Sequence, residues 1–191
     1  MAGGLAVEPA NYRARVMRRR LVHLGQGALL GLLTVVVTTS CSPAPEQVLA
    51  VEAVNGTSAR FLTMTCKQFS PNTFGVYRSD VDDDEPLQKW AVSRDFTGPV
   101  VTSVRAFHQP QGWSTYRSGI SAFKQDGTYT ASVRGAVNAK GISGRVTFSV
   151  AQLRELSADE VLTADSDGEA ETMSREDFLS QANGLCADLA S

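Results

Sequence analysis

Apolar and polar residues alternate along most of the chain after residue 47, in short runs separated by turn-forming residues. The clearest runs are 128–137 and 144–150, on either side of a Lys140-Gly141 turn. Side chains alternate between the two faces of a strand, so each run has one buried and one solvated face. The other runs are 47–55, 60–67, 73–77, 88–93, 99–107 and 113–123. We therefore predict an antiparallel sheet or sandwich over residues 47–153.

The last forty residues have a different pattern. Residues 154–173 are an acidic connection, in which Ser157 and Glu160 predict the capped start of a short helix at 158–163, followed by a solvated loop at 164–172. From Ser174 on, the apolar residues recur at helical spacing: Phe178, Leu179, Ala182, Leu185, Cys186 and Leu189. The expected fold is mainly β (α+β), with an amphipathic C-terminal helix at 174–191 packed on the sheet.

The first forty residues resemble a secretory signal. Arg18, Arg19 and Arg20 precede the apolar segment 24–37, which is followed by small residues and then Cys41. A cationic end, an apolar middle and a small-residue cleavage site predict export of everything downstream. A start at Met17 would give a more usual short cationic region and leave residues 1–16 untranslated.

Cys41 stands where bacterial lipoproteins carry their acylated cysteine, directly after the apolar segment and Ser40. Thr38 departs from the aliphatic residue usual three positions earlier. Acyl chains on Cys41 would anchor the protein on the outer face of the cell membrane, and the proline-rich segment 41–46 would act as a short extended tether. The alternatives are an uncleaved membrane anchor and a freely secreted protein, and all three place the body outside the cytosol.

Cys66 and Cys186 remain as an even pair in an oxidising compartment. Alternation places Cys66 on the same strand face as Leu62 and Met64, and Cys186 belongs to the apolar stripe of the last helix. A disulfide between them is expected, and two separate buried thiols are the alternative.

Charge and composition argue against several classes of function. Five of the 18 basic residues and one of the 20 acidic residues precede Cys41, so the chain from Cys41 on carries 13 basic and 19 acidic residues, a net charge of −6. A body that acidic does not favour nucleic-acid binding. His108 is the one histidine beyond the signal, and no Gly-x-Ser-x-Gly elbow is present. We expect no enzyme, no cofactor and no metal, and interpret the acidic segments 80–85 and 165–169 as solvated loops rather than calcium sites, because they lack EF-hand spacing.

Several aromatic residues are candidates for a ligand groove. Phe107, Trp113 and Phe123 are the main ones, with Trp90 and Tyr116 as further members. Core packing is the alternative, and we favour it because large aromatic side chains dominate protein cores.

Five short segments resemble one known family. They are Thr63-Met64-Thr65-Cys66, Tyr116-Arg117-Ser118-Gly119-Ile120, Lys124-Gln125-Asp126-Gly127-Thr128-Tyr129, Arg134-Gly135-Ala136-Val137 and Arg145-Val146-Thr147-Phe148-Ser149-Val150. Together they are similar to the mycobacterial surface lipoprotein antigens and their actinobacterial relatives, over roughly residues 60–150. The resemblance implies an acylated envelope protein with a small β-rich domain and no catalytic residues. The family's closing strand usually ends in the second cysteine, whereas here Gln152 follows Ala151 and the next cysteine is Cys186.

Two roles are consistent with these expectations. The first is a surface interaction or structural protein of the cell envelope, antigen-like, with another surface protein as its partner. The second is a carrier or binder of an envelope lipid or glycolipid. A carrier needs an apolar cavity, whereas an interaction protein can be packed solid.

Overall fold

The structure is a computed structural model that describes residues 47–81, 88–95 and 98–190. The predicted signal, the acylation site Cys41 and the tether 41–46 lie outside the described residues. None of the helices in the described part of the chain is both long enough and apolar enough to cross a membrane.

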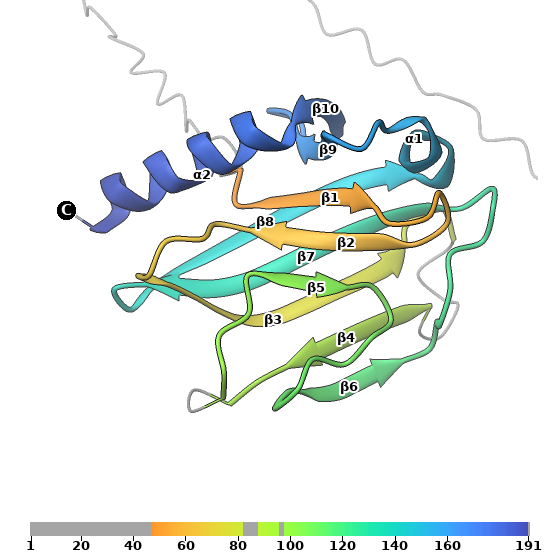
Figure 1. Cartoon of the computed structure of the whole chain (residues 1–191). Helices are drawn as coiled ribbons and strands as arrows, with labels where there is room; N and C mark the ends of the chain where they lie inside the picture. The colour runs from red at the N-terminus through yellow and green to blue at the C-terminus, as the bar shows by residue number, and fades with distance from the viewer. Residues whose placement is uncertain (1–46, 82–87, 96–97, 191) are drawn as a thin grey trace, which may run out of the picture. The chain divides into compact units, whose positions relative to one another are not determined.

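Ten strands form two five-stranded antiparallel sheets (Figure 1). In chain order the elements are β1 (Leu49–Ala53), β2 (Ala59–Thr63), β3 (Phe69–Arg78), β4 (Lys89–Ser93), β5 (Ser103–Arg105), β6 (Ser114–Ser118), β7 (Thr128–Val137), β8 (Lys140–Ser149), α1 (Val150–Glu155), β9 (Glu160–Ala164), β10 (Ala170–Ser174) and α2 (Arg175–Ala190). The first sheet has the order β10-β9-β1-β2-β5, and the second has the order β6-β4-β3-β7-β8. This arrangement, with α2 packed against it, confirms the expected mainly β fold.

The β7–β8 hairpin follows the alternation read from the sequence. Tyr129, Ala131 and Val133 of β7 and Phe148 of β8 are at most 1% exposed, whereas Arg134 of β7 and Arg145 of β8, on the other face, are exposed. The turn differs from the prediction, because Lys140 and Gly141 already belong to β8. The chain reverses at Asn138 and Ala139, whose φ angles are +48° and +68°. Two successive residues with positive φ are the signature of a tight type I′ hairpin turn.

The prediction for residues 154–173 is wrong. Residues 158–163 do not form a helix, and 164–172 is not a solvated loop, because this segment forms the β9–β10 hairpin. Leu162 pairs with Val51 of β1, which adds the hairpin to the first sheet. The β domain therefore continues past residue 153 to Ser174, and α2 begins at Arg175. The short helix α1 lies earlier, and its capping box joins Ser149 and Gln152.

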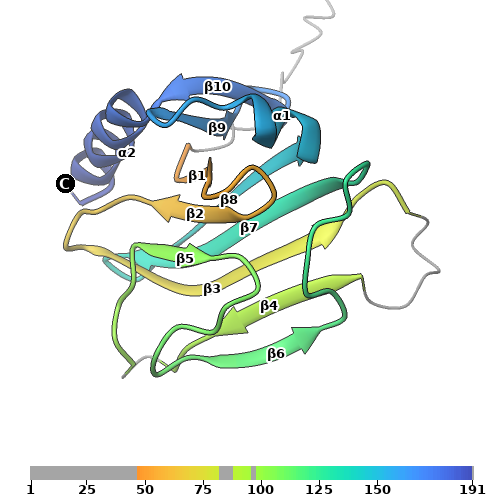
Figure 2. The ribbon, with the colours of Figure 1, turned by 45° about the vertical axis from the view of Figure 1, so that its right-hand side comes forward.

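The C-terminal helix is joined to the start of the domain by the predicted disulfide. Cys66 and Cys186 are bonded, with their Cα atoms 6.4 Å apart. Phe178 of α2 is fully buried, and Asn183 accepts hydrogen bonds from the backbone N–H and the side-chain hydroxyl of Thr65, both at 3.1 Å. Figure 2 shows α2 beside β9 and β10, at the end of the molecule away from β6.

A glycine of β8, Gly144, lies directly against the start of β1 in the other sheet. A Cβ atom built on Gly144 would lie 2.6 Å from the side chain of Val48 and 3.1 Å from that of Leu49. Carbon atoms in contact are normally 3.5–4.0 Å apart, so this position has room for hydrogen alone.

Candidate functional site

All three aromatic residues predicted to line a groove pack against other aromatic rings, and two of them, Phe107 and Phe123, belong to one cluster. The ring centre of Phe107 lies 5.9 Å from that of Trp90 and 4.8 Å from that of Phe123. Phe123 in turn lies 4.8 Å from Tyr129 and 5.8 Å from Phe148. These edge-to-face contacts are favourable and extend the core between the sheets. The core-packing alternative describes this cluster better than an open groove does.

Trp113 lies in a different environment. It is 3% exposed, its ring centre is 5.6 Å from that of Phe74, and its indole N–H donates to the carbonyl of Pro99 at 3.1 Å. The guanidinium of Arg94 lies 6.0 Å from the indole and donates to the carbonyls of Pro71 and Gly98. Trp113 and Arg94 therefore hold connecting segments in place.

The backbone at Phe107 is strained. Its φ is +63°, which is unusual for a bulky residue, and the strand predicted over 99–107 is reduced to β5. The neighbouring His108 is exposed, and its ring is oriented by the carbonyl of Ala106 at 2.9 Å.

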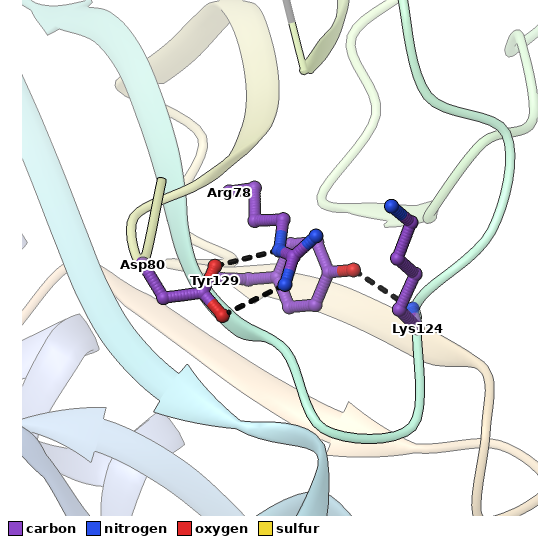
Figure 3. A network of polar contacts seen from close by, with 4 residues as sticks. All are labelled: Arg78, Asp80, Lys124 and Tyr129. Atoms are coloured by element: carbon purple, nitrogen blue, oxygen red, sulfur yellow. Dashed lines mark hydrogen bonds and ion pairs between the residues drawn. The ribbon is translucent and has the colours of Figure 1, made fainter. Parts of the chain in front are cut away.

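A network of polar contacts lies beside the aromatic cluster and includes one of its members, Tyr129 (Figure 3). Arg78 makes a two-pronged ion pair with Asp80, at 2.6 and 3.0 Å, and the hydroxyl of Tyr129 accepts from the backbone N–H of Lys124 at 2.8 Å. The hydrogen bond from Arg78 lowers the pKa of Asp80 and raises that of Arg78. Both partners are neutralised within the pair, so we interpret the network as structural.

A second charged cluster joins α2 to the first sheet. The carboxylate of Glu52 lies 2.7 Å from Arg60 and 3.5 Å from Arg175, and its side chain is 11% exposed. These residues line a hollow of about 270 Å³. Each carboxylate oxygen already faces an arginine, which makes the cluster a support for the start of α2.

The acidic segment 165–169 forms a turn shaped by its own hydrogen bonds. Asp165 accepts hydrogen bonds from the N–H groups of Asp167 and Glu169, at 2.8 and 3.0 Å, and so shapes the β9–β10 turn. Residues 82–85 lie outside the described residues. Across 47–81, 88–95 and 98–190, no group of three or more potential metal ligands comes together.

The outer face of the second sheet carries a basic groove. Its residues are Tyr77, Lys89, Ser132, Arg134, Ser143 and Arg145, and we call it the outer groove. It comprises a hollow of about 100 Å³ and an adjoining one of about 550 Å³, which share Arg134 and Ser143. The ammonium group of Lys89 lies 5.8 Å from the ring centre of Tyr77. Sequence alternation indicated that Arg134 and Arg145 face outward, but it did not show that β3 and β4 lie beside them.

Comparison with family models, with curated proteins and with solved structures gives no match. The likeness to the surface lipoprotein antigens therefore stays a prediction from the sequence. Of the places described, the outer groove is the one where three cations and no carboxylate line an open hollow, and it is our candidate functional site.

Proposed function

We propose that this chain is an exported envelope lipoprotein, anchored by an acylated Cys41 on the outer face of the membrane, with a surface interaction role and no catalytic activity. The observation that carries the proposal is the disulfide between Cys66 and Cys186. Disulfides persist mainly outside the cytosol, which agrees with the signal-like first forty residues. The bridge also uses two of the three cysteines, leaving the one at the predicted acylation position.

Two observations support an interaction role. The aromatic residues expected to line a cavity are packed on one another or on Phe74. The outer groove, by contrast, presents hydroxyls and cations on the open outer face of the second sheet. Such a surface suits contact with a partner better than enclosure of an apolar ligand.

Intact-mass analysis of the membrane fraction tests the anchor. We expect the wild-type chain to begin at Cys41 and to carry the mass of its acyl chains, and Cys41→Ala to lose both the added mass and the membrane association. The Cys66→Ala, Cys186→Ala variant is the matched control, because it removes two cysteines and should keep the acyl mass. An unmodified wild-type chain that retains its signal would indicate an uncleaved anchor, and one released into the medium would indicate simple secretion.

One observation favours the alternative role as carrier of an envelope lipid or glycolipid. Phe107 and Phe123 are only half-buried and lie outside the strands, and Phe107 has a strained backbone. Strain of this kind often marks a segment that rearranges. Native mass spectrometry of the purified chain tests this role: a lipid retained by the wild type and lost in Phe123→Ala would favour the carrier.

A further inference from the structure

We infer that the outer groove binds an anionic polysaccharide, a sugar polymer bearing carboxylate, phosphate or sulfate groups. The inference rests on the proposed function in one respect, because export brings the chain to the surface where such polymers occur. It names the class of partner, which the proposed function leaves open.

Strand register brings the groove residues together on one face. Arg134 of β7 is opposite Ser143 of β8, and Arg145 of β8 is opposite Ser132 of β7. The two arginines are therefore diagonal neighbours, a relation that places side chains roughly 7–8 Å apart on the same face. Ser132 is in turn opposite Gly75 of β3. Two guanidinium groups thus stand over a floor of small residues, which leaves their donors accessible.

Within the described residues, the cations of the groove have no carboxylate partner. In the described part of the chain, Lys89, Arg134 and Arg145 form no ion pair with a carboxylate, although Arg60 and Arg78 do. Three cations line the groove and no carboxylate of the described chain does, in a body that carries −6 from Cys41 on, and this local excess of positive charge favours an anionic partner.

Lys89 follows the acidic residues 82–85 closely in the sequence, so the assignment rests on the two arginines. Arg134 is level with Thr73, in the middle of β3, and Arg145 is opposite Ser132, which is level with Gly75, whereas β3 ends at Arg78. The two arginines of β7 and β8 are thus displaced along the sheet from the point where the acidic segment begins.

The shape and chemistry of the groove favour a sugar polymer. The two adjoining hollows form one open trough, suited to an extended chain rather than to a small ion. The hydroxyls of Tyr77 and Ser143 can donate to sugar hydroxyls and accept from them, and the hydroxyl of Ser132, which donates to the carbonyl of Gly75 at 3.5 Å, can still accept. A membrane-binding face would be expected to insert apolar side chains. The large apolar residues most exposed in the described chain, Val100 and Tyr116, are not groove residues.

Calorimetric titration of the full chain, purified in a nonionic detergent at physiological salt, tests the inference. The probes are polygalacturonate, uncharged dextran of similar length, and mixed micelles of phosphatidylglycerol in the same detergent. The groove variant is Arg134→Ser with Arg145→Ser. The control variant is Arg105→Ser with Arg154→Ser, which removes two exposed arginines from other elements and so changes the net charge equally.

We expect binding to polygalacturonate and none to dextran. Loss of a charge-assisted hydrogen bond lowers affinity about tenfold or more, so the groove variant should bind about a hundredfold more weakly. The control variant should stay close to wild type. Absence of binding, or equal loss in both variants, would overturn the inference. Stronger groove-dependent binding to phosphatidylglycerol would overturn it in favour of a membrane surface. An unacylated Cys41 with intact polygalacturonate binding would remove the anchor and leave the groove assignment standing.

Discussion

Removing the disulfide should destabilise the domain by several kcal/mol. Cys66 and Cys186 are 120 positions apart, and in the chain-entropy model a loop of that length is worth ~5 kcal/mol. Typical domains are stable by about 5–15 kcal/mol, so the Cys66→Ala, Cys186→Ala variant should lose a large part of its stability. Alanine is the right replacement at 186, because that side chain is 1% exposed and serine would bury a hydroxyl.

Urea unfolding followed by tryptophan fluorescence measures this loss. Trp90 and Trp113 are both 3% exposed, so their emission should shift when the core opens. With a slope of about 1–3 kcal/mol per molar urea, the midpoint should fall by roughly 2 M or more. Cys41→Ala keeps the bridge and should leave the midpoint unchanged. A double variant within about 0.5 kcal/mol of wild type, with an unchanged slope, would refute the view that the bridge restricts the unfolded chain.

Four further predictions concern single positions. Gly144→Ala should destabilise by about 1–3 kcal/mol because the sheets meet there, whereas Gly141→Ala, which meets nothing within 4 Å, should be close to neutral in urea unfolding. Ala139→Gly should raise the melting temperature, since a side chain at φ +68° costs about 1 kcal/mol. Thr163→Val should stabilise by about 1 kcal/mol in the same assay, because the buried Thr163 hydroxyl has no hydrogen-bond partner among the described residues. Asp80, whose pKa is lowered in the folded state, contributes stability above its unfolded pKa of about 3.9 and loses it as pH falls through the folded value. Asp80→Asn should therefore be less stable than wild type at pH 7 and equally stable near pH 2 in thermal melts; an equal gap at both pH values would contradict this.

The sequence predicted β7 and β8 well because their alternation reflects burial on one face only. It failed at 154–173 because the information there is not local. Ser157 and Glu160 match a capping box, and the N–H of Ser157 does donate to the carboxylate of Glu160 at 2.9 Å. The segment nevertheless becomes β9, because pairing with β1 buries Val161 and Leu162 together.

The same capping pattern also occurs at the start of α1, a helix that was not predicted from the sequence. Ser149 and Gln152 satisfy it, and there the reciprocal hydrogen bonds form, at 3.2 and 2.8 Å. The two sites share the motif, so the difference lies in the strands available to the chain beyond it. After Ser149 the chain leaves the sheet at its edge strand, whereas after Ser157 a neighbouring strand is available. A motif of four residues does not encode that distinction.

The outer groove shows why the candidate site was harder to predict than the fold. Lys89 and Arg145 are more than fifty residues apart, and they come together because β4 and β8 belong to one sheet whose centre is β3 and β7. Strand order and register are set by tertiary packing, so alternation alone gives the facing of each side chain and not its neighbours.

The placement of the two groove arginines also bears on whether the groove was selected for stability or for binding. Like charges that are neighbours across a strand pair repel each other, and Arg134 and Arg145 are diagonal neighbours without a carboxylate partner in the described chain. Such an arrangement costs stability, and a sequence selected for stability alone would place an acid at one of the two positions. Arg134→Glu would supply that acid. If the groove exists for an anionic partner, this variant should unfold at a higher urea concentration than wild type and lose polygalacturonate binding, the opposed changes expected where function has been kept at the expense of stability.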